Sequence, residues 1–267
     1  MINLDADAIR HSISEATAAR LASFDAFPEI ESTNSFLMQQ DGPPPGRMCV
    51  AITDNQTVGR GRHGRTWQSP PGSGLCLSLA YTYAAQPANL SALTLAIGLG
   101  VIEALERAGV GGVQLKWPND LMAADGKLGG ILTESQSPAA GAVTIVTGVG
   151  LNMNLGDISN IELDMGSARR VADLARFADV LPKHDDLAAL LIDSLCEVFV
   201  DFEVEGFDRY AGRWGERDWL FGREVVINTP KRQVMGTGAG IADDGALLVD
   251  TGKGGVRRIT SGSVVLA

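Results

Sequence analysis

The sequence of 267 residues predicts an α+β fold: a mixed or antiparallel central sheet flanked by helices, followed by a small C-terminal β-barrel. The first observation behind this prediction is that short β-rich runs alternate with amphipathic runs from about residue 24 to residue 202. The second is a change of character after residue 219, where only short strands and glycine-rich turns follow. We therefore expect a larger domain at residues 1–219 and a small one at residues 220–267.

Helices are expected where apolar residues recur every three or four positions. Residues 5–22 show this spacing behind acidic first-turn residues, so they predict one continuous helix. A polar run at residues 29–34 precedes a second, short helix. Two longer runs carry apolar side chains along one face. The expected helices cover residues 5–22, 35–40, 90–108 and 187–202.

Strands are expected where short apolar and β-branched runs are bounded by turn residues. In the larger domain these runs lie at residues 48–53, 75–83, 113–117, 130–133 and 143–150. In the small domain the runs are separated by turn sequences such as Asp243-Asp244-Gly245. They lie at residues 225–228, 234–241, 246–249 and 256–260, and runs this short and closely spaced predict a small barrel.

Charge and composition exclude several classes of protein. The 22 Lys and Arg against 32 Asp and Glu give a net charge of −10, which argues against a nucleic-acid or anionic-membrane partner. No basic segment with a long apolar run opens the sequence, and no apolar stretch is long enough to span a membrane. Cys49, Cys76 and Cys196 lie far apart in apolar surroundings, which predicts buried thiols in a reducing compartment. We therefore expect a cytoplasmic location.

The segment at residues 59–74, GRGRHGRTWQSPPGSG, is unusually rich in glycine and arginine. Gly59, Gly61 and Gly64 match the dinucleotide-binding fingerprint, but a Pro/Gly loop follows instead of a helix, and residues 75–86 contain no acid for a ribose. What remains is a mobile loop whose guanidinium and backbone N–H groups can capture a carboxylate or a phosphate. A solvated surface loop with its arginines paired to acids is the alternative.

A second cluster begins with KWPND at residues 116–120. It places Asn119 and Asp120 at a turn, where they can cap backbone or hold a metal and phosphate. Lys127 then leads the next strand. A plain hairpin with the turn Asp125-Gly126 explains this cluster equally well.

Two further segments carry polar groups at the ends of predicted elements. Residues 148–154 end a buried strand with glycine and asparagine, which fits either a bare turn or the edge of a ligand site. Residues 29–34 lead into a helix, where Ser or Thr is first of all an N-cap. The alternative is that three neighbouring polar side chains recognise a neutral polar head group.

Taken together, five segments resemble the biotin protein ligases in order and spacing. They are Ser32-Thr33-Asn34, Gln56 with GRGRHGRTW at residues 59–67, KWPND at residues 116–120, KLGGIL at residues 127–132, and Gly148-x-Gly150-x-Asn152. The GRGRxGRxW and KWPND segments are specific to that family. The resemblance covers roughly residues 28–267 and rests on five motifs in register rather than on any single one.

The resemblance implies ATP-dependent biotinylation of a specific lysine on a biotin-acceptor (carboxyl carrier) domain. The biotin carboxylate would attack the α-phosphate of ATP to give biotinyl-adenylate, and the acceptor lysine would then take the biotinyl group. Because two anions must meet, such a site needs cations, with Mg²⁺ expected beside the phosphates. The available cations are Arg60, Arg62, Arg65 and Lys127, and no protein ligand is assigned to the metal.

The resemblance also implies roles for individual residues. The catalytic candidates are Arg62 and Lys127. Biotin would contact Ser32, Thr33, Asn34, Gln56, Arg60, Gly61, Arg62, Lys127 and Gly130. The nucleotide would contact Arg65, Trp67, Asn119 and Asn152. The loop at residues 55–74 would be disordered without ligand and would close over the adenylate to exclude water.

The sequence departs from the family pattern near both ends. Residues before Phe24 cannot form the winged-helix domain that makes some members repressors, so we expect the form that lacks a DNA-binding domain. A C-terminal cation near the nucleotide is missing where it is expected, and Arg257 and Arg258 are the nearby candidates. The resemblance also allows a homodimer through a sheet edge. The alternative functions are a lipoate–protein ligase and a non-catalytic biotin-sensing module.

Overall fold

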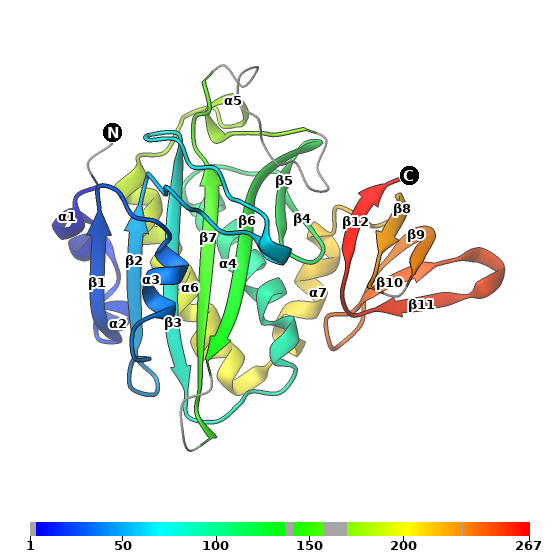
Figure 1. Ribbon diagram of the computed structural model, residues 1–267, viewed down its shortest axis with the longest axis horizontal. Helices are drawn as coiled ribbons and strands as arrows, with labels where there is room; N and C mark the ends of the chain where they lie inside the picture. The colour runs from blue at the N-terminus through cyan, green and yellow to red at the C-terminus, as the bar shows by residue number, and fades with distance from the viewer. Residues whose placement is uncertain (1–3, 137–140, 157–169, 231) are drawn as a thin grey trace.

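A seven-stranded sheet forms the centre of the protein in the computed structural model, which describes residues 4–136, 141–156, 170–230 and 232–267 (Figure 1). Its strands are β1 (Leu21–Phe27), β2 (Met48–Thr53), β3 (Gly74–Tyr83), β4 (Val113–Lys116), β5 (Asp120–Ala123), β6 (Gly126–Gln136) and β7 (Val143–Asn152). They are ordered β1-β2-β3-β7-β6-β5-β4. The β1–β2 pair is parallel and the other neighbouring pairs are antiparallel, which confirms the predicted mixed sheet.

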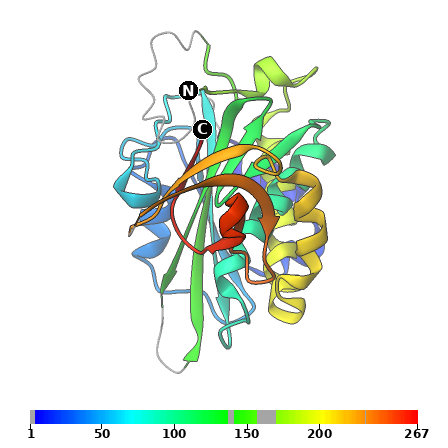
Figure 2. The same ribbon diagram turned by 90° about the vertical axis from the view of Figure 1, so that its right-hand side faces the viewer.

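Helices cover the two faces of this sheet unequally (Figure 2). They are α1 (Ala6–Ser12), α2 (Glu15–Ala18), α3 (Thr33–Met38), α4 (Leu93–Arg107), α5 (Leu174–Phe177), α6 (His184–Glu205) and α7 (Asp208–Arg217). The long helices α4 and α6 pack on each other and on one face, where their apolar side chains join the main core. On the other face, Leu37 of the short α3 packs in a small separate cluster with Ala51, Ala80 and Val146. The rest of this second face is left for a pocket.

The C-terminal part forms its own antiparallel sheet. Its strands are β8 (Glu224–Asn228), β9 (Gln233–Ile241), β10 (Leu247–Asp250), β11 (Val256–Ile259) and β12 (Ser263–Leu266). They are ordered β11-β10-β9-β8-β12, and β11 and β12 are edge strands that do not pair with each other in the described chain. A barrel needs that pairing to close. The predicted barrel is therefore corrected to an open five-stranded sheet, and strand β12 was not predicted.

The N-terminal segment also differs from its prediction. The single helix expected at residues 5–22 ends at Ser12, and Ile13 is extended. Ser14 then caps α2 by accepting a hydrogen bond from the N–H of Thr17, while its own N–H donates to the Asp193 carboxylate at 3.0 Å. The chain enters β1 at Leu21. The prediction failed because Ile9 and Ile13 are buried in both arrangements, so their spacing does not reveal the break.

Two indole groups join the C-terminal sheet to the central sheet. Trp117, just after β4, donates its Nε1–H to the carbonyl of Gly245 at 3.0 Å in the turn between β9 and β10. Trp219, just before β8, donates its Nε1–H to the carbonyl of Ala124 at 3.1 Å in the turn between β5 and β6. The two parts are thus fixed to each other on both sides of the β4–β5 hairpin. The division at residues 219 and 220 stays a prediction.

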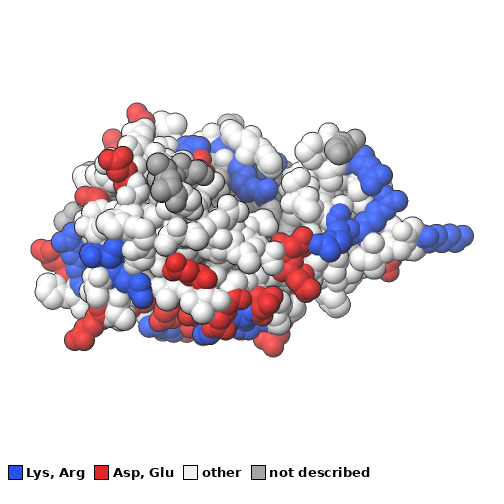
Figure 3. Space-filling view, turned by 90° about the horizontal axis from the view of Figure 1, so that it is seen from below, with Lys and Arg blue, Asp and Glu red and all other residues white. Residues whose placement is uncertain are grey.

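The surface carries its charges unevenly. Residues 220–267 contain six Lys or Arg and four Asp or Glu, so they are net positive in a chain whose total is −10. Lys and Arg side chains stand along the C-terminal lobe in Figure 3. Within the described ranges, no helix combines the length and the apolar character that crossing a bilayer requires.

Candidate active site

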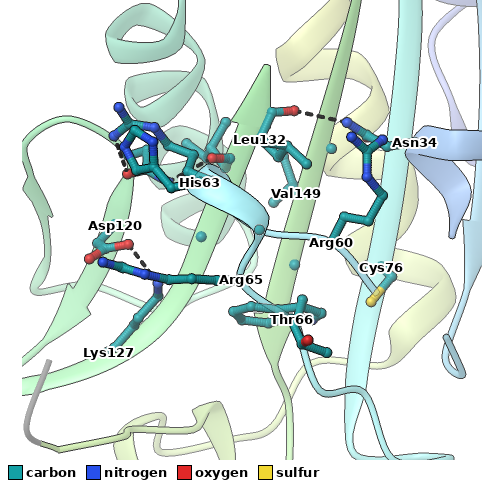
Figure 4. Close-up of a pocket in the computed structure, with 18 of the residues that line it drawn as sticks. Asn34, Arg60, His63, Arg65, Thr66, Cys76, Asp120, Lys127, Leu132 and Val149 are labelled. Carbon is teal, nitrogen blue, oxygen red and sulfur yellow. Dashed lines mark hydrogen bonds and ion pairs between the residues drawn. The ribbon is translucent and has the colours of Figure 1, made fainter. Parts of the chain in front are cut away.

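One pocket on the α3 side of the central sheet gathers all thirteen residues to which the resemblance assigned a biotin contact, a nucleotide contact or a catalytic role (Figure 4). These thirteen residues are Ser32, Thr33, Asn34, Gln56, Arg60, Gly61, Arg62, Arg65, Trp67, Asn119, Lys127, Gly130 and Asn152. They come from α3, the 55–74 loop, the β4–β5 turn, β6 and β7. The sheet order explains the convergence, because β3, β7 and β6 are adjacent and the loop crosses above them.

Small residues form the floor of the pocket. Alternation along β3 turns Cys76 toward it, and β7 contributes Gly148 and Gly150. A Cβ atom added at Gly150 would lie 2.6 Å from Cε2 of the Trp67 ring, and one at Gly148 would collide with Oδ1 of Asn34. The indole and the amide therefore rest directly on bare backbone.

The end of the pocket beside α3 is polar and carries no net charge, since the Arg60 guanidinium beside Asn34 is paired with Glu134. Thr33 donates its N–H at 2.9 Å and its hydroxyl at 3.2 Å to Oε1 of Gln56. The Ser78 hydroxyl lies 2.7 Å from both Thr33 Oγ1 and Asn34 Oδ1. Ser32 accepts from the N–H of Ser35, which confirms it as an N-cap and leaves its hydroxyl hydrogen for another acceptor. These buried groups form an ordered network of donors and acceptors.

The loop at residues 55–74 forms a hairpin across the pocket. The N–H of Gly61 donates to the carbonyl of Arg65 at 2.7 Å, and the N–H of Trp67 donates to the carbonyl of Gly59 at 2.9 Å. A 3₁₀ turn at Arg62–Gly64 makes its tip. A Cβ at Gly59 would collide with the Trp67 carbonyl, so only glycine permits this strand approach. The predicted disorder of this loop without ligand stays a prediction.

Cationic side chains line the opposite end. Arg62 donates from Nη1 to Oδ1 of Asn119 at 3.1 Å, and Asn119 in turn donates to the carbonyl of Ile131 at 2.8 Å. Burial lowers the pKa of Arg62, while the Asp120 carboxylate opposes that effect. The lowered pKa marks the cost of holding this charge away from water. Asn119 therefore aims a desolvated guanidinium into the pocket.

Lys127 points into the same end and is held by Asp120. Its Nζ lies 2.6 Å from Oδ1 of Asp120 and 5.9 Å from the centre of the Trp67 ring. The other carboxylate oxygen of Asp120 faces Nζ of Lys116 at 3.9 Å. Lys116 is 2% exposed, and burial lowers its pKa to about 8. Asp120 thus lies between two lysines, one in the pocket and one behind it.

Two predicted residues contact other protein groups, and for Arg60 this contact is the pairing with an acid that the sequence analysis gave as the alternative. Arg60 forms a two-point ion pair with Glu134, with Nη2 at 2.7 Å from Oε1, and its side chain is 43% exposed. Asn152 donates its amide to the carbonyls of Lys127 at 3.3 Å and Ala172 at 3.0 Å. Arg60 is thus paired with an acidic side chain and Asn152 is bonded to backbone, so their predicted ligand contacts stay predictions.

The sequence reasoning missed several lining residues. Among them are Cys76 and Ser78. A signal for both was present, because β3 alternates small residues with leucines at 75–79. Asp120 and Gly148 also line the pocket, and they lie in segments that the sequence singled out, although neither was assigned a biotin or nucleotide contact. At the C-terminal side, the candidates Arg257 and Arg258 are corrected: neither lines the pocket, and Arg258 pairs with Asp244 at 2.7 Å. The lining residues there are Gly262, Ser263 and Val264.

The described residues contain no group of three or more His, Cys, Asp or Glu that could hold a metal ion. Asp120 is the carboxylate in the pocket lining, and it is paired with Lys127. Mg²⁺ often binds through one or two carboxylates together with substrate phosphates and waters. The residues present therefore fit a magnesium ion that arrives with a nucleotide better than one bound permanently by the protein.

Two family models match the chain. The model described as the Biotin/lipoate A/B protein ligase family matches residues 26–152, which supply most of the pocket. The model described as the Biotin protein ligase C terminal domain matches residues 220–267.

Individual proteins are similar over most of the chain. The bifunctional ligase/repressor BirA of Salmonella typhimurium is 35% identical over 248 residues, which cover 92% of this chain and 73% of that protein. The biotin–[acetyl-CoA-carboxylase] ligase of Mycobacterium tuberculosis is 32% identical over 224 residues, covering 81% and 78%. The solved biotin protein ligase from Aquifex aeolicus in complex with biotin and ATP matches with a TM-score of 0.76 and 25% identity, covering 92% of this chain and 100% of that one. The chain therefore belongs to the biotin protein ligase family of enzymes.

Proposed function

We propose that the protein uses ATP to attach biotin to a lysine of a biotin-acceptor protein through a biotinyl-adenylate intermediate. The observation that carries this proposal is a pocket that has a polar end without net charge and a cationic end on a floor of glycines. A ligand with a neutral hydrogen-bonding head and a carboxylate tail matches both ends. The relatives named as biotin ligases and the related structure with biotin and ATP support the choice of substrates.

The polar end suits the ureido ring of biotin. That ring offers one carbonyl acceptor and two N–H donors, all of which lose water on binding. Ser32 can donate its hydroxyl hydrogen, and the oxygen of Asn34 can accept. Because Thr33 and Gln56 hold each other in place, these groups are oriented before the ligand arrives.

The cationic end suits the first chemical step. A biotin carboxylate oxygen attacks the α-phosphorus of ATP, the new P–O bond forms, and the bond to the β-phosphate oxygen breaks so that pyrophosphate leaves with the electron pair. Negative charge is crowded at the phosphorus during this step. Lys127 and Arg62 lie where they can neutralise the two anions, and Arg65 lines the same end. When bound with ATP, Mg²⁺ neutralises phosphate charge at this end.

The second step transfers the biotinyl group. A neutral lysine amine attacks the acyl carbon, a C–N bond forms, and the C–O bond to the phosphate breaks so that AMP leaves with the electron pair while the nitrogen loses a proton. Trp67 covers the pocket floor and limits access of water to the mixed anhydride. No nucleophile from this chain is required.

The test uses purified protein with biotin, ATP, Mg²⁺ and a biotin-acceptor domain, and it has two readouts. Mass spectrometry is expected to show the acceptor modified at its lysine, with an acceptor carrying arginine at that position as the control. Biotin-dependent exchange of labelled pyrophosphate into ATP is expected to report the adenylate. Labelling with lipoate but not biotin would favour a lipoate–protein ligase, and tight biotin binding without exchange would favour the sensing module.

A further inference from the structure

A second cavity of about 270 Å³ lies behind the cationic end of the pocket. It is bounded by the start of α4, the β4–β5 turn, β6 and the turn between β9 and β10. The residues that line it but not the first pocket are Ser91, Thr94, Leu95, Thr133, Asp244, Gly245, Ala246 and Thr260. The two cavities share Arg62, Trp117, Pro118, Asn119 and Ile131. Their common wall is thus the place where the guanidinium of Arg62 meets Asn119.

We propose that this second cavity is the channel through which the acceptor lysine reaches the bound adenylate. The inference rests on the function proposed above. The proposed function places biotin and nucleotide in the first pocket, so the third substrate needs a route that these two ligands leave open. The lysine side chain is an unbranched four-carbon stem with an amine at its end, and it must reach the acyl carbon next to the phosphate. The second cavity shares Arg62 with the first pocket, so it can lead the lysine amine to that carbon.

The lining combines hydroxyl groups with buried apolar side chains. Ser91 and Thr260 are exposed, Thr94 and Thr133 are half-buried, and Leu95 is 2% exposed. The hydroxyl groups can replace water around the amine as it enters, and Leu95, with the shared Ile131 and Pro118, can pack against the methylene stem that follows it. This mixture suits a side chain with a polar end and an apolar stem.

Charges at the two ends favour the same substrate. Asp244 lines the cavity on the C-terminal side and stays ionised, because a hydrogen bond from the N–H of Ala246 and the nearby Arg258 lower its pKa. Arg258 pairs with this carboxylate at 2.7 Å, and the remaining lone pairs of the carboxylate can accept a hydrogen bond from an ammonium group as it approaches. At the inner end Arg62 disfavours a second positive charge, which promotes loss of the proton and leaves the neutral amine that the reaction needs.

The walls are held rigidly. The hydrogen bond from Trp117 to the carbonyl of Gly245 ties the C-terminal turn to the shared wall. A Cβ at Gly245 would lie 2.9 Å from Cβ of Ala92 and 3.0 Å from Cδ1 of Leu95, so the turn packs closely on α4. The C-terminal sheet therefore contributes one side of the channel rather than a nucleotide contact through Arg257 or Arg258.

The channel can be blocked without touching the first pocket. Thr94→Trp fills the cavity, and Thr94→Val keeps its shape as the matched control. We expect Thr94→Trp to retain biotin-dependent pyrophosphate exchange and transfer of biotin to hydroxylamine, a nucleophile small enough to pass. Transfer to the acceptor lysine should fall on the order of 100-fold, because the amine can no longer align with the acyl carbon. Thr94→Val should transfer normally.

Equal losses in exchange and in acceptor transfer, or an unchanged acceptor rate, would overturn the channel. The proposed function fails separately if the unmodified protein shows no biotin-dependent exchange. A second measurement needs no variant: the protein, loaded with biotin and ATP, is offered butylamine and its branched isomer sec-butylamine. A lysine-shaped channel should favour the linear amine by about 10-fold beyond their ratio toward free biotinyl-adenylate in solution. If the protein showed the same ratio of the two amines as free biotinyl-adenylate in solution, the proposal would be contradicted.

Discussion

The ammonium of Lys127 and the carboxylate of Asp120 lie 2.6 Å apart because a β-bulge brings their strands into an irregular register. Leu121 faces Gly129, but the next residue, Met122, faces Lys127, so β6 carries one extra residue at this point. The bulge re-aims the lysine at the start of β6 toward the pocket. Both side chains belong to the segments singled out from the sequence, but their contact follows from the bulge.

Lys127→Ala should slow adenylate formation on the order of 100-fold, because one preorganised cation is lost where charge develops. Biotin-dependent pyrophosphate exchange is the measurement. Lys253→Ala, which removes an exposed lysine in the turn between β10 and β11, is the control and should leave the rate unchanged. Near-normal exchange by Lys127→Ala refutes its catalytic role.

Arg62→Gly should release biotinyl-adenylate into solution, since the variant loses a guanidinium that Asn119 holds in the pocket, where we propose that the adenylate phosphate binds. One charge-assisted hydrogen bond contributes about 2 kcal/mol, which corresponds to roughly 30-fold weaker retention. Filtration followed by chromatography measures the free adenylate. Arg62→Lys keeps the charge and should restore part of the retention. If neither variant leaks more than the unmodified protein, Arg62 does not hold the intermediate.

Gly148→Ala should weaken biotin binding by about 10-fold or more, because a Cβ there collides with Asn34 and disturbs the polar end. Gly150→Ala should displace the Trp67 ring and also affect nucleotide binding. Calorimetry measures both. Gly212→Ala in α7 is the matched control, since its Cβ meets nothing within 4 Å. Unchanged biotin affinity in Gly148→Ala would show that the network tolerates movement.

Lys116→Met tests the buried lysine through pH. Burial lowers the Lys116 pKa to about 8, whereas the unfolded chain keeps it near about 10.4. Between these values the unfolded state binds more protons, so this residue makes the free energy of unfolding rise with pH by at most about 3 kcal/mol. Below about pH 8 Lys116 is protonated in both states, and the full cost of burying its charge lowers the free energy of unfolding. Urea unfolding from pH 7 to 10 should show that rise in the free energy of unfolding for the unmodified protein and a smaller rise for Lys116→Met. Parallel curves for the two proteins would contradict the lowered pKa of Lys116.

The sequence predicted most of the central sheet because its strands are bounded by clear turn residues. Strand β2 at Met48–Thr53 matches its prediction in full, and β7 extends its prediction by two residues at Leu151 and Asn152. Strand β5 was hidden, because Asp120–Ala123 has only four residues and follows a turn. Strand β1 at Leu21–Phe27 was not among the predicted strands, and its first two residues fell inside the predicted first helix. Short elements carry too little periodicity to be separated from their neighbours.

Site residues were predicted where the type of side chain alone indicates its chemistry. They were missed where their position in the pocket depends on neighbouring residues in the fold. Arginines and lysines in a glycine-rich setting indicate anion binding on their own. Cys76 gives no such sign, and it enters the pocket because β3 alternation and the bare Gly150 opposite it leave space there. The C-terminal lining was also missed, since Gly262 and Val264 reach the pocket through the packing of two sheets.

The glycine floor constrains how the specificity of this protein can evolve. Gly148 and Gly150 already present the smallest possible surface, so every substitution there adds atoms and narrows the site. Substitutions at these two floor glycines can therefore only exclude ligands that the pocket now accepts. A pocket for a wider ligand must come from the roof, through Trp67 and its hairpin, which can lengthen or shift without disturbing the sheet. Acquisition of new ligands is therefore directed to one loop.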